Sequence, residues 1–301
     1  MNHTSGGRRW TLLDLLNWTT NYFERAGIES PRLNAELLLA EVTGQERVML
    51  YARFDEELAP EERARFHGLV RRRAGREPLQ YLLGRAQFYG RSFRVTPAVM
   101  VPRPETELVV EKCLAKIGTG AAGLRAAEVG TGSGVVAVTL ACERPALRLT
   151  ATDSSAAALE VARGNAERHG VADRVSFAEG HLCEPLAPLA PEKLGLLVSN
   201  PPYVPTSQIE KLQPEVRDYE PRQALDGGPD GLSVVRELVP AASGLLAPGG
   251  WLVLELGEGQ AQAVRDILNL TSAFEPDSIE TVRDGSGCER VMAARRKQII
   301  G

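Results

Sequence analysis

The segment LRAAEVGTGSGVVAVTLAC, residues 124–142, places three glycines between a mainly apolar run of strand length and a second apolar run. Glycine allows the backbone to turn tightly and to approach a ligand closely, and the free N–H groups at the start of a following helix favour an anionic group. We therefore predict a strand, a glycine-rich loop and a helix that bind a nucleotide-like cofactor. The spacing is G-x-G-x-G rather than G-x-G-x-x-G, so a nicotinamide dinucleotide fits less well. A plain tight turn is the alternative reading.

The chain on either side of this loop alternates between apolar runs and helical stretches. We expect strands at 124–129, 147–152, 175–178, 194–199 and 251–256, and helices at 135–142, 156–169, 232–246 and 260–270. This alternation is typical of an α/β protein with a doubly wound, mostly parallel, Rossmann-like sheet. Two last strands, at 279–282 and 290–294, would close the sheet as an antiparallel pair.

The residues before this region follow helical spacing instead. Leu12, Leu15, Leu16 and Phe23 share one stripe, and a second helix starting at Ser30-Pro31 would place 33, 37 and 40 on its apolar side. The stretch FYGRSFRVTPAVMVP, 88–102, suggests a short β-hairpin around Gly90. We therefore expect a small helical domain at 1–85, a β-hairpin connector at 86–103 and a second domain at 104–301.

Composition excludes several classes of protein. With 301 residues, 43% of them hydrophobic and 25% charged, the chain is neither disordered, collagen-like nor a disulfide scaffold. Its net charge of −4 provides no strong field for nucleic acid or anionic lipid. The four cysteines are too scattered for a metal site, and no apolar run approaches the ~18 residues of a membrane span. We expect a cytoplasmic monomer that binds no metal, no membrane and no nucleic acid stably.

Asp153 follows the second expected strand of the sheet. A carboxylate at this position, about 20 residues beyond the glycine loop, can accept hydrogen bonds from both hydroxyls of a ribose. The alternative is that Asp153 caps the helix that follows. The glycine loop upstream favours the ligand.

The tetrapeptide Asn200-Pro201-Pro202-Tyr203 follows the fourth strand, so it should face the same crevice as the glycine loop. Two prolines fix the backbone and remove two N–H donors, which leaves carbonyls that only accept, beside an Asn oxygen that also accepts. Such a pair of acceptors suits an NH2 group, and the tyrosine ring can stack on a planar amide or base.

These motifs together resemble those of class I S-adenosylmethionine methyltransferases that act on planar nitrogen. Three further stretches, PRPETE at 102–107, EPRQALDGG at 220–228 and DGSGCER at 284–290, are similar to the release factor glutamine methyltransferase family. The resemblance covers nearly the whole chain and is weakest before Arg85. It implies a helical N-terminal substrate-recognition domain, a β-hairpin and a seven-stranded methyltransferase domain.

The resemblance also implies a substrate, a cofactor and a site. The substrate would be the glutamine in the Gly-Gly-Gln motif of class I peptide chain release factors, methylated on its side-chain amide nitrogen, N5, by S-adenosyl-L-methionine in support of translation termination. The cofactor would lie against Gly130, Thr131, Gly132, Ser133, Gly134, Asp153, Leu182 and Asn200. Asn200, Pro201, Pro202 and Tyr203 would hold the glutamine, with Asn200, Pro201 and Tyr203 as the catalytic group. Two positions depart from the family pattern, Glu128 in place of Asp and His181-Leu182 in place of Asp with a bulky residue, and we expect them to alter cofactor affinity.

The chemistry requires acceptors rather than a titrating base. If the Asn200 side chain and the Pro201 carbonyl accept both N–H protons, they fix the amide, raise the electron density on its nitrogen and aim it at the sulfonium methyl. Alternatives are methylation of a glutamine in a ribosomal protein, methylation of the exocyclic amine of adenine in DNA or RNA, and a non-catalytic Rossmann-like binding module. The acidic chain disfavours the nucleic-acid substrate.

Two other stretches have open interpretations. The arginines at 71, 72, 73 and 76 are either a solvated helix end or a surface for an acidic partner or ribosomal RNA. The stretch 204–231 lacks clear periodicity and is long for an idle loop, so it is either a lid over the substrate peptide or a surface insertion with short helices.

Overall fold

The computed structural model describes residues 10–119, 123–189 and 193–298. Chain contacts divide the molecule into two units. The helical unit comprises the chain up to Gly84 together with Pro214–Tyr219, and the sheet unit comprises Arg85–Gln213 and the chain from Glu220 onward. Expectations about the first nine residues lie outside the described part. Within that part, no helix is long and apolar enough to cross a membrane.

The helical unit has an apolar core formed by short helices. These are α1 (Leu12–Arg25), α2 (Pro31–Thr43), α3 (Arg47–Ala52), α4 (Pro60–Ala74) and α5 (Leu79–Leu83). The one-turn α9 (Pro214–Arg217) also belongs to this unit but buries no side chain. Thr11 and Asp14 cap α1 reciprocally, and the predicted stripe of α1 is buried. The predicted stripe of α2 is wrong, because Leu33 is exposed and the buried apolar face consists of Ala35, Leu38, Leu39 and Val42.

Arg73 near the end of α4 is buried, so the interpretation of a solvated helix end is wrong for this residue. Its side chain is 7% exposed, and it donates hydrogen bonds to Asn34 at 2.7 Å and to Glu215 at 3.0 and 3.1 Å. Arg76 also donates to Glu215, at 3.0 Å through Nε, and Tyr219 donates to the Gly75 carbonyl at 2.7 Å. The stretch 214–219, which belongs to the long segment without periodicity, is therefore part of the helical unit.

Replacement of Glu215 by alanine should lower the stability of the helical unit by about 2 kcal/mol, because it leaves a buried guanidinium without its carboxylate. Urea unfolding followed by circular dichroism measures the change. Glu56→Ala is the matched control, since Glu56 pairs with Arg53 where both side chains are more than 40% exposed, 43% and 44%; it should change stability by less than ~0.5 kcal/mol. Equal effects of both variants would contradict a special role of Glu215.

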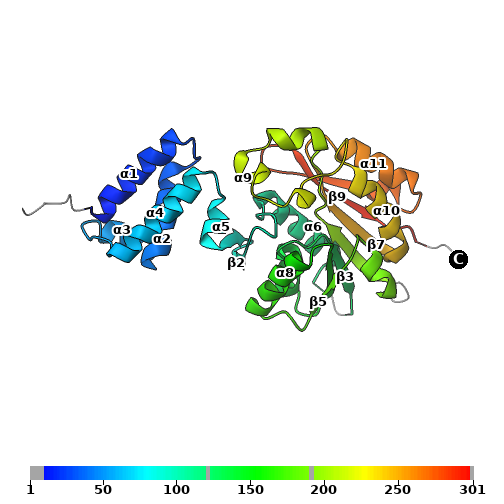
Figure 1. The fold of residues 1–301 in the computed structure, drawn as a ribbon. Coiled ribbons are helices and arrows are strands. Elements are labelled where there is room, and N and C mark those ends of the chain that lie inside the picture. Colours follow the sequence, from blue (N-terminus) through cyan, green and yellow to red (C-terminus); the bar gives the residue numbers. More distant parts are fainter. Residues whose placement is uncertain (1–9, 120–122, 190–192, 299–301) are drawn as a thin grey trace, which may run out of the picture. The chain divides into compact units, whose positions relative to one another are not determined.

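The sheet unit begins with the antiparallel hairpin of β1 (Arg85–Phe88) and β2 (Arg91–Arg94). Its seven-stranded sheet, in the order β5-β4-β3-β6-β7-β9-β8, confirms the predicted fold class (Figure 1). Strands β3 to β7 run parallel, whereas β9 pairs antiparallel with both β7 and β8. The strands are β3 (Arg125–Val129), β4 (Arg148–Asp153), β5 (Val175–Glu179), β6 (Leu194–Ser199), β7 (Leu246–Glu255), β8 (Glu280–Arg283) and β9 (Glu289–Arg295).

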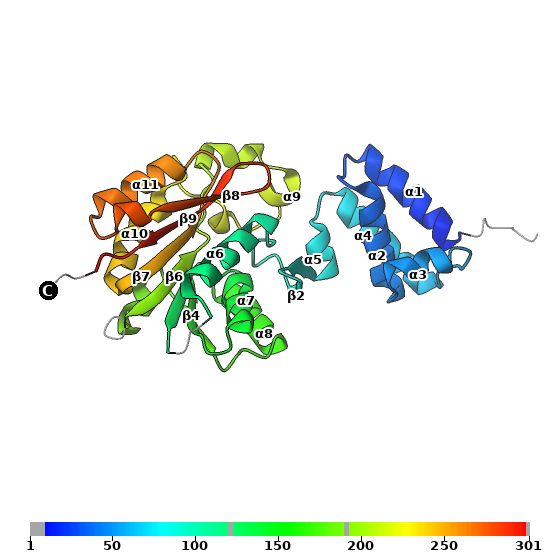
Figure 2. The ribbon, with the colours of Figure 1, turned by 180° about the vertical axis from the view of Figure 1, so that it is seen from behind.

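Helices cover both faces of this sheet (Figure 2). Because side chains alternate along a strand, Ala126 and Leu196 face one apolar core while Ala127 and Leu197 face the other. The first core includes α6 (Glu107–Ile117), α7 (Val135–Glu143) and α8 (Ala156–Arg168), and the second α10 (Ser233–Leu245) and α11 (Ala261–Leu270). Short 3-10 turns span Pro104–Thr106, Glu184–Leu189, Thr206–Lys211, Arg222–Ala224 and Pro276–Ser278.

The strand order places a crevice at the carboxyl ends of β3 and β6. The chain proceeds outward from β3 through β4 to β5 and then returns to β6 on the other side of β3. Ligands of doubly wound folds bind where the strand order reverses in this way. The glycine loop follows β3 and the Asn-Pro-Pro-Tyr tetrapeptide follows β6, so both predicted motifs lie at this position.

Candidate active site

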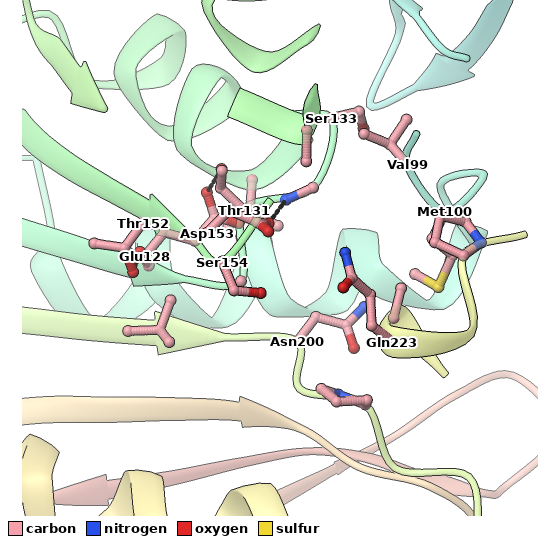
Figure 3. Close-up of a pocket in the computed structure, with 18 of the residues that line it drawn as sticks. Val99, Met100, Glu128, Thr131, Ser133, Thr152, Asp153, Ser154, Asn200 and Gln223 are labelled. Carbon is pink, nitrogen blue, oxygen red and sulfur yellow. Dashed lines mark hydrogen bonds between the residues drawn. The ribbon is translucent and has the colours of Figure 1, made fainter. Parts of the chain in front are cut away.

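A cavity of about 360 Å³ opens at the carboxyl ends of the parallel strands (Figure 3). It is formed by the glycine loop, the ends of β4 and β6, and two segments from outside the strands, 98–102 and 221–226. Of the predicted site residues, those that line it are Gly130, Thr131, Gly132, Ser133, Asp153, Leu182, Asn200 and Pro202. Gly134, Pro201 and Tyr203 do not line the cavity.

The glycine loop is held against β4 by its own backbone. The N–H groups of Gly130 and Thr131 both donate to the carbonyl of Thr152, each at 2.9 Å. Gly134 has φ +81°, and a Cβ there would lie 3.1 Å from the Cβ of Ala162, so only glycine allows the start of α7 to approach α8 so closely. Gly134 thus has a packing role.

Glu128 is a buried carboxylate at the base of this loop. Its Oε2 accepts hydrogen bonds from Thr131 Oγ1 at 2.6 Å and from the Ala137 N–H at 3.1 Å, while its side chain also lines the cavity. Burial raises the pKa of Glu128 to about 8, against these two hydrogen bonds, which lower it. The carboxyl group of Glu128 is therefore mainly protonated at pH 7.

The raised pKa of Glu128 predicts that stability falls as pH rises. The ordinary pKa is 4.5 and the folded value about 8, so between these pH values the folded state binds more protons than the unfolded state. The free energy of unfolding should then decrease, by about 1 kcal/mol per pH unit where the dependence is steepest. Unfolding of the ligand-free protein at pH 5 to 8 measures this. Glu128→Gln should reduce the slope, most clearly between pH 7 and 8, because Glu255, whose pKa is raised to about 7, also contributes below pH 7. An unchanged slope in that variant would contradict the assignment.

Asp153 at the end of β4 closes the other side of the loop. Its Oδ2 accepts a hydrogen bond from the Gly132 N–H at 2.9 Å, and its Oδ1 accepts one from the Ser155 N–H at 2.9 Å. The helix cap is Ser155, whose hydroxyl accepts from the Ala158 N–H at 3.2 Å. Asp153 is therefore not the cap of α8, and its carboxylate faces the cavity (Figure 3).

The Asn-Pro-Pro-Tyr tetrapeptide is supported by the segment 225–228. Val204 donates to the carbonyl of Leu225 and accepts from the N–H of Gly227, both at 2.9 Å, so the chain after the tetrapeptide pairs with a parallel neighbour. Asn200 points into the cavity. Tyr203 does not line the cavity, and its hydroxyl donates to the buried Glu255 at 3.4 Å.

Several residues near Asn200 were not among the predicted site residues. Thr106 lines the cavity and accepts a hydrogen bond from Asn200 Nδ2 at 3.3 Å, and Glu255 lies behind it. Met100 and Gln223 also line the cavity. The sequence could have indicated Glu255 as a site residue, because Glu255 is an acid at the end of a parallel strand, as Asp153 is.

Both departures from the family pattern, Glu128 described above and His181-Leu182, lie at the cavity. His181 lines it and contacts Glu237 Oε2 through Nε2 at 3.1 Å. Leu182 lines it with φ +45°, an uncommon conformation for a residue other than glycine. No cluster of potential metal ligands is present in the described chain.

Comparisons with known proteins agree with this architecture. A family model described as PrmC N-terminal domain matches residues 14–84, and one described as methyltransferase small domain matches residues 106–214. A 16S rRNA N2 G1207 methyltransferase of T. thermophilus, solved with AdoMet and guanosine, has a TM-score of 0.52 at 19% identity over 71% of this chain and 50% of its own. That likeness concerns the fold alone. The fold and the matching family model together identify the sheet unit as a methyltransferase domain.

Curated relatives identify the family. The release factor glutamine methyltransferase of Geobacter sulfurreducens is 47% identical over 95% of this chain and 97% of its own. That of Moorella thermoacetica is 44% identical over 96% of this chain and 99% of its own. The chain belongs to the release factor glutamine methyltransferase family.

Proposed function

We propose that this enzyme transfers a methyl group from S-adenosyl-L-methionine to the side-chain amide nitrogen of the glutamine in the Gly-Gly-Gln motif of class I peptide chain release factors. The observation that carries the proposal is the position of Asn200, whose side-chain amide enters the cavity beside the glycine loop. A nucleotide-binding loop next to a fixed hydrogen-bond acceptor is what transfer to an amide requires.

The cavity has the polar groups that this cofactor needs. Glu128 is a buried acid whose pKa of about 8 keeps it protonated at pH 7, and a cationic amine placed beside it would lower that pKa and stabilise the carboxylate. Asp153 presents a carboxylate at the neighbouring strand end, where a ribose binds in doubly wound folds. We propose that Leu182 packs against the adenine and that Gly130–Ser133 contact the methionine end.

The bound cofactor would supply an electrophilic methyl on a sulfonium. The protein itself orients the nucleophile, an amide nitrogen with a delocalised lone pair. Asn200 Oδ1 accepts one of its two N–H protons, and the carbonyl of Pro201, the next residue of the chain although not part of the cavity lining, is proposed to accept the other. This restricts the rotation of the amide and directs its nitrogen toward the methyl group. As the nitrogen gains the methyl group, the sulfur–methyl bond would break to leave a neutral thioether, and the nitrogen would lose one of its two protons to solvent. Pro202 closes the side of the cavity, and Tyr203 fixes the tetrapeptide from behind through Glu255.

We propose that the helical unit recognises the release factor. We also propose that the enzyme is a monomer and acts in the cytoplasm. The low net charge disfavours stable binding to nucleic acid.

The test is transfer of labelled methyl from S-adenosyl-L-methionine to a class I release factor and to its Gly-Gly-Ala variant, with ribosomal proteins, DNA and RNA as parallel acceptors. Label on the intact factor alone supports the proposal. Label on a ribosomal protein or on nucleic acid instead would replace the release factor by one of the alternative substrates. Label on the Gly-Gly-Ala variant would contradict the assignment of the glutamine.

A further inference from the structure

Glu255 is a buried acid that the proposed chemistry does not use directly. Glu255 is the last residue of β7 and is 2% exposed. Burial of a carboxylate is costly unless hydrogen bonds compensate for the lost water. The register of the sheet pairs Ser199 of β6 with Leu254 of β7, so the next residues, Asn200 and Glu255, lie side by side at the carboxyl ends of adjacent strands. Glu255 therefore lies beside the residue that carries the proposed acceptor.

Two hydrogen bonds link Glu255 to Asn200 through Thr106. Thr106 Oγ1 donates to Glu255 Oε2 at 2.7 Å, and Asn200 Nδ2 donates to Thr106 Oγ1 at 3.3 Å. A hydroxyl has one proton to donate, so a Thr106 that donates to Glu255 can only accept from Asn200. The NH2 end of the Asn200 amide must then face Thr106, and its Oδ1 must face the opposite way.

The direction of this chain depends on the charge of Glu255. An ionised carboxylate only accepts, which fixes the order Asn200 to Thr106 to Glu255. A protonated Glu255 can donate to Thr106, whose hydroxyl would then donate to Asn200 and draw the amide oxygen toward it. The amide would turn over and present its NH2 to the substrate NH2, so two donors would meet.

We propose that Glu255 is a positioning residue which, through Thr106, holds the Asn200 side chain with its oxygen toward the substrate amide. This deepens the proposed function and rests on it in one respect, the use of Asn200 Oδ1 as the acceptor. Burial raises the pKa of Glu255 to about 7, with a further increase from Glu105, while hydrogen bonds from Thr106, Tyr203 and Asn200 lower it. The arginines that act on the adjacent Tyr203 are Arg103 and Arg290.

The first experiment compares variants at saturating S-adenosyl-L-methionine with a release factor as substrate. Thr106→Val removes the hydroxyl, and Glu255→Gln replaces a carboxylate that only accepts by an amide that can also donate. Each should lower kcat about 10- to 100-fold, less than the roughly 100- to 1,000-fold cost of losing a hydrogen bond made directly to the reacting group. Thr106→Ser keeps the hydroxyl and should recover most of what Thr106→Val loses. Thr139→Val is the matched control, since Thr139 is fully buried in α7 and its Oγ1 has no hydrogen-bond partner in the described chain.

The pH profile distinguishes positioning from a purely structural role. In the wild type, kcat/KM for the release factor should rise with pH around a midpoint near 7, because the ionised form of Glu255 is the active one. In Glu255→Gln the profile should be low and flat between pH 6 and 8. A flat wild-type profile, or Glu255→Gln activity within about threefold of wild type, would overturn the proposal.

A second readout is independent of the substrate. The side-chain 15N–1H resonances of Asn200 should shift with pH around 7 in the wild-type protein and stay constant in Glu255→Gln. If release factors accept no methyl but this titration is present, the proposed function fails while the link between Glu255 and Asn200 stands. If methyl transfer occurs and the Asn200 resonances do not titrate, the positioning role fails alone.

Discussion

Asn200→Ala should transfer methyl to a release factor roughly 100- to 1,000-fold more slowly than the wild type at saturating cofactor, a larger effect than its loss of cofactor affinity. The variant loses the side-chain acceptor that fixes the substrate amide, and the Pro201 carbonyl alone leaves that amide free to rotate. Single-turnover transfer at saturating cofactor measures the effect, and calorimetry measures cofactor binding. The loss should appear in kcat rather than in KM, because the interaction is strongest when the amide nitrogen gains positive charge.

Asn200→Asp provides a sharper comparison for the same position. It keeps an oxygen toward the substrate but places a second carboxylate near Glu255 and removes the donor to Thr106. We expect activity no better than that of the alanine variant at pH 7. Full methyl transfer by Asn200→Ala, with normal cofactor binding, would refute the role of Asn200 Oδ1 as an acceptor for the substrate amide.

Gly227→Ala should lower activity about 100-fold, since displacement of a reacting group by around 1 Å has effects of that size. A Cβ at this position would lie 2.7 Å from the carbonyl oxygens of both Pro202 and Gly231. Both neighbours are backbone atoms, so the methyl group can be accommodated only if the Pro202 peptide moves. The same strain should lower the midpoint of thermal unfolding.

The matched control for Gly227→Ala is Gly164→Ala. Gly164 lies within α8, and a Cβ there would meet no atom within 4 Å. Because alanine is the better helix former, this variant should be more stable by up to ~1 kcal/mol and fully active. An active Gly227→Ala would show that the Pro202–Tyr203 peptide can move without displacing Asn200 Oδ1 and the Pro201 carbonyl, the two proposed acceptors.

Local sequence patterns predicted the sheet unit well, and the physical reason is periodicity. Apolar runs such as 124–129 and 194–199 are buried on both faces, so the strand signal does not depend on long-range contacts. The order of the strands then brings the glycine loop, Asp153 and Asn200 to one edge without further information. The roles assigned to these residues remain predictions.

Sequence alone could not predict features that depend on distant partners. Arg73 resembles any cation at a helix end, and only its contacts with Asn34 and Glu215 explain its burial. Glu255 and Thr106 are separated by 149 residues, so neither suggests the other before the sheet is assembled. The stripe predicted for α2 failed because two apolar faces compete in that helix, and tertiary packing selects one of them.

The placement of 214–219 among the helices bears on how such a protein can be divided or recombined. The polypeptide joins the two units at three points, after Gly84, before Pro214 and after Tyr219. A deletion of the first 84 residues would remove the partners of Glu215 and Tyr219 and leave the stretch 214–219 without the side chains and carbonyl it bonds to. The helical unit is thus no detachable module, and an exchange of target-recognition parts between relatives would have to transplant both stretches of chain together.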